Sequence, residues 1–363
     1  MLRTLAANRL NVLLAAAPTC WILYALAPQS PWVFIGAAVS LIPLAGIIGL
    51  GTEQLARRSG PTLGGFLNAT FGNAAELIIA LVALNDNHID LVKASITGSI
   101  VGNLLLVLGL SFFVGGMGRR SQKFHRTAAT NSAAMLFLAV VALVMPAVFD
   151  LAVYGNLRVP SVALDRLSIW SALVLILAYA GNLIYAFTAQ RDLFRSAPES
   201  KDDTKEDPRM SGAAAVGLLA GGTVLTTIQA EILVGAMQPA LTRFGLTEMF
   251  VGVIVIAIIG NAAEHYSAVL AARRDEMTLA VEIAVGSSAQ IALFVAPALV
   301  LYSHLIGRPM SLLFNAFEIT AITLSVFATA IVVADGESNW VEGLQLLAVY
   351  LILALAFYFV PAI

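Results

Sequence analysis

Residues 72–76 read Gly-Asn-Ala-Ala-Glu, and residues 260–264 read Gly-Asn-Ala-Ala-Glu again. The two copies lie inside long apolar stretches, FLNATFGNAAELIIALVAL at 66–84 and VGVIVIAIIGNAAEHYSAVLAA at 251–272. A carboxylate is costly in such surroundings, so each glutamate indicates a functional site. Two identical copies indicate that the site is duplicated.

The composition excludes an ordinary soluble domain. The chain has 363 residues, of which 59% are hydrophobic and 12% are charged, against about 25% charged for an average globular domain. Its mean hydropathy is +0.88. The apolar runs are near the roughly 20 residues of a membrane-spanning helix and exceed the roughly 10 of a barrel strand. We therefore expect the lipid bilayer as the surroundings, and no nucleic-acid partner.

The apolar runs predict an all-α polytopic membrane protein with about eleven transmembrane helices. The single cysteine, Cys20, cannot form an intrachain disulfide. The predicted spans are 11–27, 32–56, 62–84, 91–114, 128–149, 165–188, 212–241, 247–271, 278–302, 311–333 and 341–361.

The basic residues predict the orientation of these spans. With the N-terminus in the cytosol, 15 of the 20 Lys and Arg residues fall in inside segments. This asymmetry is what the positive-inside rule requires. The segment 334–340 is also predicted inside, although it contains no basic residue. The five outside bases are Lys93, Arg158, Arg166, Arg243 and Arg308.

The same alternation gives the two pentapeptides opposite directions. The third span runs from inside to outside, and the eighth runs from outside to inside. Similar sequences in opposite orientations predict an inverted repeat of five plus five helices with an extra N-terminal helix, and transporters of this kind bind substrate near the bilayer midplane. The predicted parts are an N-terminal helix at 1–30, a first repeat at 31–190, a cytosolic linker at 191–210 and a second repeat at 211–363.

Each pentapeptide presents oxygen ligands. An Asn and a Glu three residues apart lie on one face of a helix, which pairs Asn73 with Glu76 and Asn261 with Glu264. The glycine before each pair weakens the helix and frees backbone carbonyls, which a membrane tolerates only at a cavity, an ion or protein. Carboxylate, amide and carbonyl oxygens suit Ca²⁺ better than zinc or copper. Two carboxylates neutralise one divalent ion.

The same carboxylates are suited to proton exchange. Burial and a like-charged neighbour both favour the neutral form of a carboxyl group, whereas metal binding requires the charged form and releases protons. Competition between metal and protons at one site, combined with alternating access, gives antiport without a separate proton channel.

Other polar residues in the predicted spans are candidates for the ion path. Alternatively, these residues have a structural role and form hydrogen bonds between helices within the lipid bilayer. Those in the fourth and ninth spans are Ser99, Asn103, Ser287 and Gln290.

His265 follows the second pentapeptide and points about 100° away from Glu264. It is a candidate proton relay, or else a packed histidine. Glu53 precedes the first pentapeptide and Glu231 precedes the second, each in the preceding span, and both are candidate gate or relay carboxylates. A buried helix cap or a position at the membrane interface is the alternative for both.

Several stretches resemble the cation/proton exchanger (CAX) family of calcium antiporters, over about residues 45–361. They are LNATFGNAAELIIA, GSIVGNLLLVLGLSFFVGG, IIGNAAEHYSAV, GSSAQIALFVAP and DGESNWVEG. The resemblance implies eleven helices, in which helices 2–6 and 7–11 are inverted halves and helices 2 and 7 move as gates. It also implies Ca²⁺/H⁺ exchange, with Ser287 and Gln290 near the ion path. The ion site it implies consists of Asn73, Glu76, Asn261 and Glu264.

One segment departs from that family. Its members often have a markedly acidic cytosolic helix between the halves that is linked to calcium regulation. The corresponding segment in this chain, 191–210, is only weakly acidic, so strong regulation through it is not expected.

The sequence therefore predicts a secondary transporter that exchanges Ca²⁺ for protons, with no cofactor, in a prokaryotic cytoplasmic membrane, with a vacuolar membrane as the alternative. Glu76 and Glu264 would bind metal and protons alternately. The alternatives are Na⁺ as counter-ion, another cargo such as Na⁺, K⁺ or Mn²⁺, or an ion channel. An intramembrane enzyme is not supported, because the sequence contains no His-Glu-x-x-His or Gly-x-Gly-Asp motif.

Overall fold

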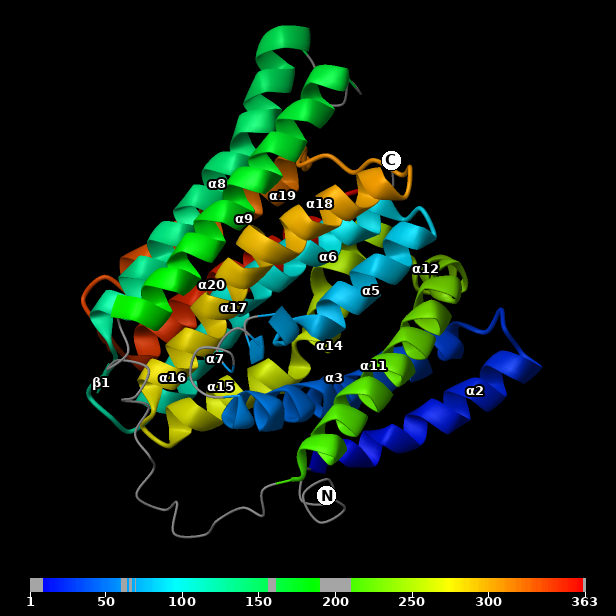
Figure 1. The fold of residues 1–363 in the computed structure, drawn as a ribbon, viewed down its shortest axis with the longest axis horizontal. Helices are drawn as coiled ribbons and strands as arrows, with labels where there is room; N and C mark the ends of the chain where they lie inside the picture. The colour runs from blue at the N-terminus through cyan, green and yellow to red at the C-terminus, as the bar shows by residue number, and fades with distance from the viewer. Residues whose placement is uncertain are drawn as a thin grey trace.

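The computed structural model describes residues 9–59, 64, 67, 68, 70–155, 161–189 and 210–361. Apart from one two-stranded ladder, the regular elements of this part are helices (Figure 1). The predicted all-α polytopic membrane fold is confirmed. The predicted linker lies outside the described residues, except for Met210.

The helices and strands fall into two groups along the chain. The first group contains η1 (Arg9–Ala15), α2 (Ala16–Leu26), α3 (Pro31–Arg58), α5 (Ala74–Asn85), α6 (Ile89–Val101), η2 (Gly102–Val107), α7 (Leu108–Gly116), β1 (Gln122–Lys123), α8 (Arg126–Tyr154) and α9 (Val162–Ala189). The second group contains α11 (Gly212–Gly235), α12 (Met237–Phe244), α13 (Glu248–Phe250), η3 (Val251–Ile256), α14 (Ala257–Gly260), α15 (Ala262–Arg273), α16 (Met277–Val281), η4 (Glu282–Gly286), α17 (Ser287–Gln290), η5 (Ile291–Val295), α18 (Ala296–Leu305), α19 (Ala316–Val332), β2 (Glu337–Ser338) and α20 (Trp340–Phe359).

Length and composition identify fewer spans than the eleven expected. In the described chain, seven helices are long and apolar enough to cross a membrane, or eight if one bent pair counts as a span. Three shorter apolar helices lie at the predicted first, third and tenth spans: Asn11–Leu26, Ala74–Asn85 and Ala316–Val332. They fall short because the first begins in a 3₁₀ stretch, the third begins only at Ala74 inside the first pentapeptide, and the tenth has only 17 residues.

The bent pair is better described as a chain reversal. Helix α12 and the helical segment Glu248–Gly260 meet at 109°. Gly245 between them has φ +64°, a backbone conformation that favours glycine. The segment after the reversal continues through η3 and α14 to Gly260, and α15 carries the chain on to Arg273. This is the predicted eighth span.

Both pentapeptides interrupt a helix. Gly72 and Asn73 form a turn before α5, and Asn261 separates α14 from α15. The backbone of Asn73 has φ −99° and ψ 30°, and that of Asn261 has φ −91° and ψ 6°. These values depart from those of a regular α-helix. The expected weakening of the helix at each glycine is therefore seen as a local break.

Helices α3 and α11 pack together along one side of the bundle, with α2 beside α3 (Figure 1). The contact is close because glycines lie in it. A Cβ at Gly51 would lie 3.0 Å from the Leu219 nitrogen, and one at Gly222 would lie 3.1 Å from Ile47. Gln229 Nε2 also donates to Ser40 Oγ at 2.7 Å. In Figure 1, α5, α6 and α14 lie between this pair and the α8–α9 hairpin.

A short antiparallel ladder joins two loops at one end of the bundle. Gln122 pairs with Ser338 and Lys123 with Glu337. Gln122 Nε2 also donates to Asp275 Oδ1 at 2.7 Å, which brings in a third loop. All three loops belong to segments that are predicted to lie on the cytosolic side. One of them is the segment 334–340, which contains no basic residue. We call this the inner end.

Loops predicted outside meet at the opposite end, which we call the outer end. His88 Nδ1 lies 3.0 Å from Glu248 Oε1. Arg308 Nη1 donates to the Leu84 carbonyl at 3.4 Å. The contacts at both ends therefore agree with the alternation of spans.

This arrangement predicts the sidedness of labelling by a membrane-impermeant maleimide. Cys20 is 2% exposed and bonds to the Val33 carbonyl through Sγ at 3.4 Å, so the wild-type protein should react weakly. Lys123→Cys should be labelled only from the cytosolic side, and Arg243→Cys only from the other side. Both side chains are exposed. Labelling of both variants from the same side in intact cells would contradict the arrangement.

Candidate ion-binding site

The two pentapeptides contact each other directly. A Cβ at Gly260 would lie 3.3 Å from Cγ and 3.4 Å from Oε1 of Glu76. Gly260 therefore leaves room for the carboxylate of the other pentapeptide, a role that the sequence pattern did not predict. No pattern within 260–264 could have shown it, because Glu76 is 184 positions away in the sequence.

The first asparagine bonds to residues of the ninth predicted span. Asn73 Nδ2 donates to Gln290 Oε1 at 2.7 Å, and Ser287 Oγ donates to Asn73 Oδ1 at 2.7 Å. Asn73 is 2% exposed and Ser287 is 6% exposed. Hydrogen bonds gain strength in such a low-dielectric setting, so these contacts hold the break before α5 against α17.

The second asparagine bonds to residues of the fourth predicted span. Asn261 Nδ2 donates to Ser99 Oγ at 3.1 Å and to the Ala257 carbonyl at 3.0 Å. Asn103 Nδ2 donates to Asn261 Oδ1 and to Ser287 Oγ, at 3.2 Å each. The structure thus brings Ser99, Asn103, Ser287 and Gln290 into one network with both asparagines.

The two carboxylates lie beside this network. Glu76 is in the first turn of α5 and Glu264 in the first turn of α15, where the helix dipole favours negative charge. Glu76 packs against Gly260, which lies four residues before Glu264, so the two carboxylates belong to the junction of the two pentapeptides. Two carboxylates in this arrangement repel each other unless a cation or protons are shared between them.

At this site, two buried oxygens have no hydrogen-bond donor in the part of the chain that the structure describes. Glu264 Oε2 and Asn103 Oδ1 find no hydrogen-bond partner among the described residues. Leaving such atoms unsatisfied costs about 1–3 kcal/mol each, and more for a charged group. Oxygen acceptors without donors suit a hard cation. The described residues contain no cluster of three or more His, Cys, Asp or Glu, so a cation bound between them would need amide, hydroxyl or backbone oxygens as well.

Three predicted residues lie apart from the network. His265 is half-buried, and its Nε2 has no hydrogen-bond partner in the described part of the chain. Glu53 is exposed near the inner end of α3 and pairs with Arg57 at 2.7 Å. Glu231 is exposed on α11. The relay and gate roles of these residues stay predictions.

A small cavity of about 10 Å³ borders Glu76, Ser99 and Gly260. Ser95 also lines it, and the sequence patterns did not single out that residue. The spacing along the helix could have indicated Ser95, because Ser95, Ser99 and Asn103 follow one another at intervals of four residues.

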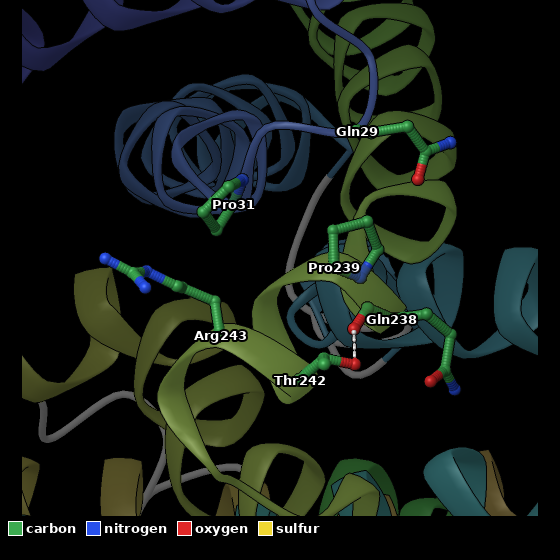
Figure 2. A pocket seen from close by; sticks show the side chains of 6 residues that line it. All are labelled: Gln29, Pro31, Gln238, Pro239, Thr242 and Arg243. Atoms are coloured by element: carbon green, nitrogen blue, oxygen red, sulfur yellow. Dashed lines mark hydrogen bonds between the residues drawn. The ribbon is translucent and has the colours of Figure 1, made fainter.

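A larger, open depression of about 660 Å³ lies at the outer end. Figure 2 shows its polar side chains pointing in different directions, with Arg243 and Gln29 directed apart. All six lining residues come from the α2–α3 turn and α12, away from the pentapeptides: Gln29, Pro31, Gln238, Pro239, Thr242 and Arg243. We do not assign it to the ion site.

The fold and the oxygen-lined site between two broken helices define an ion transporter of the membrane. The chain belongs to the sodium/calcium exchanger protein family, whose model matches residues 29–188 and 214–359. It is 41% identical to the Ca²⁺/H⁺ antiporter of Synechocystis sp., over 97% of each chain. It is 37% identical to vacuolar cation/proton exchanger 2 of Oryza sativa, over 96% of this chain and 81% of that protein.

Among solved structures, native YfkE matches with a TM-score of 0.82 and 38% identity, covering 97% of this chain and all of that one. The resemblance to the cation/proton exchangers is confirmed, and the protein is a transporter rather than an enzyme.

Proposed function

We propose that this protein exchanges Ca²⁺ for protons by alternating access, and that Glu76 and Glu264 bind the metal and the protons in turn. The observation that carries the proposal is the packing of Glu76 against Gly260 of the other pentapeptide, together with a buried Glu264 oxygen that has no donor among the described residues. The Ca²⁺/H⁺ antiporter similar to this chain over nearly its whole length supports the choice of ions.

Charge accounts for the exchange. With both carboxylates ionised, the site carries two negative charges that one Ca²⁺ neutralises. Asn73 and Asn261 each use Oδ1 to accept one hydrogen bond, and an amide oxygen has a second lone pair for a cation. When the metal leaves, protonation neutralises the carboxylates instead, since metal binding and protonation exclude each other. The net charge of the site is thus close to zero when Ca²⁺ is bound and also when both carboxylates are protonated.

Orientation follows from the distribution of basic residues. With the N-terminus in the cytosol, the inner end faces the cytosol, and 15 of the 20 bases then lie on that side, as the positive-inside rule favours. In a prokaryotic cytoplasmic membrane, protons then arrive from the outer end and displace Ca²⁺ outwards. The inverted five-helix halves are part of this proposal.

The test uses everted vesicles and ⁴⁵Ca²⁺. An imposed pH gradient, acidic in the lumen, should drive uptake, and a protonophore should abolish it. Replacing the pH gradient with a sodium gradient should give no uptake. Uptake that is unaffected by the protonophore and is driven by the sodium gradient would overturn proton coupling. It would not contradict Ca²⁺ binding at the oxygen-lined site.

Gly260→Ala tests the contact between the pentapeptides. The added methyl group would lie 3.3 Å from Glu76 Cγ, so the carboxylate must move. Overpacking of this kind costs about 1–3 kcal/mol, and we expect the Ca²⁺ concentration for half-maximal uptake to rise at least about five-fold. Gly235→Ala is the matched control, because a Cβ there meets nothing within 4 Å. Equal kinetics for the two variants would exclude the contact as a determinant of binding.

A further inference from the structure

The small cavity borders Glu76, and its lining residues do not include Glu264. Glu76, Ser95 and Ser99 provide its polar wall, and Gly260 also borders it. Its volume is about 10 Å³, which is close to the minimum that holds one water molecule. The rest of the wall is apolar: Ile79, Ala80, Ile96, Ile256, Ile291 and Val295.

The chain direction places this cavity on the outer side of the carboxylate. Helix α5 runs from Glu76 towards the outer end, and Ile79 lies about one turn further along it. Helix α6 starts at the outer end, so Ser95 lies one turn further out than Ser99. On the other broken span, Ile256 precedes Gly260 and lies further out as well. The cavity therefore extends from Glu76 towards the outside.

Ser95 is, with Glu76, one of the two half-exposed residues of this wall. From Ala94 to Leu105 every residue is buried except Ser95, which is half-exposed. Its hydroxyl donates to the Val92 carbonyl at 2.8 Å. A hydroxyl oxygen that donates in this way keeps lone pairs for accepting a hydrogen bond. Ser95 Oγ can therefore accept a hydrogen bond from a water molecule whose other hydrogen points to Glu76.

We propose that Ser95 is a positioning residue for proton access to Glu76 from the outer side. A water in the cavity donates one proton to the Glu76 carboxylate and takes one from a hydronium ion on the outer side. The water is thereby regenerated, and the net change is one proton moved inwards. Ser95 holds the water and is not itself ionised. This inference rests on the proposed function, since it takes Glu76 as a proton-binding group.

The second half has no serine at the matching place. Ser99 in GSIVGN matches Ser287 in GSSAQI. Four residues before Ser287 the chain has Ile283, where the first half has Ser95. The relay is therefore specific to the outer side, and Ile283 offers a control position in the same local context.

The test measures proton and calcium dependence separately in everted vesicles, whose lumen corresponds to the outer side. For Ser95→Ala, the luminal proton concentration for half-maximal exchange should rise roughly three- to ten-fold, as expected for one lost hydrogen bond. The bath Ca²⁺ concentration for half-maximal exchange should stay unchanged. Ile283→Ala should leave the proton dependence as in the wild type.

A second comparison separates the effect of the Ser95 hydroxyl from the effect of side-chain volume. Thr and Val have nearly the same shape, so Ser95→Thr should keep the wild-type proton dependence and Ser95→Val should show the loss. Equal behaviour of these two variants, or an unchanged proton dependence in Ser95→Ala, would overturn the inference. A parallel rise in the calcium requirement would also overturn it, since that indicates a structural role. Full activity of Glu76→Gln would instead contradict the proposed function.

Discussion

Glu264→Gln and Glu76→Gln should each abolish Ca²⁺ transport. Glutamine keeps the shape of the side chain but can neither neutralise the cation nor release a proton. Removing one charged partner from a buried interaction costs about 2–5 kcal/mol, which is roughly 30-fold to several thousand-fold in affinity. The ⁴⁵Ca²⁺ assay in everted vesicles measures the loss. Since Glu264 Oε2 lies buried without a donor among the described residues, the amide group at this position should be accommodated without loss of folding.

Glu337→Gln is a matched control for this pair. Glu337 belongs to β2 and its Oε1 lies 3.5 Å from Lys123 Nζ in an exposed ion pair. Such pairs contribute about 0–1 kcal/mol, so transport should stay near the wild-type rate. Wild-type transport by either Glu76→Gln or Glu264→Gln would remove the paired-carboxylate mechanism.

Asn261→Ala should cause the second-largest loss. The substitution removes the bonds from Asn261 to Ser99, Asn103 and the Ala257 carbonyl together. It also removes an amide oxygen beside the carboxylates. Buried partners left unsatisfied cost about 1–3 kcal/mol each, so we expect at least about a ten-fold fall in transport. Purified protein should also show a lower melting temperature in detergent.

Asn182→Ala is the control for this substitution. Asn182 accepts a hydrogen bond from Asn131 at 3.1 Å on the exposed surface of the α8–α9 hairpin. Its loss should leave both transport and the melting temperature nearly unchanged. If Asn261→Ala behaves in the same way, the network has no role in binding or in stability.

Sequence patterns were most informative where a local rule decides the outcome. A glycine followed by an asparagine in an apolar run predicted a weak point in the helix, and both breaks occur there. The expectation that Asn and Glu share one helical face was less accurate. Asn73 and Asn261 lie at the breaks, and only the glutamates lie inside the following helices.

Contacts between distant segments were not predictable in this way. The fit of Glu76 against Gly260 and the cavity next to Ser95 depend on how four helical segments cross. The fourth and ninth spans also contain the π-helical stretches η2, η4 and η5, which rotate the following residues relative to a regular α-helix. A period of 3.6 residues therefore does not tell which side chains face the site.

The asparagines obtain their side-chain partners across the molecule. Asn73 bonds to Ser287 and Gln290, whereas Asn261 bonds to Ser99 and Asn103. A half-length chain with one pentapeptide would therefore hold a single carboxylate and an asparagine without its side-chain partners. If the two halves are inverted as proposed, the smallest assembly that reproduces this centre is two such chains inserted in opposite directions. Gene duplication and fusion would make that pairing permanent, and a harmful change on one side could then be rescued only by a change on the other.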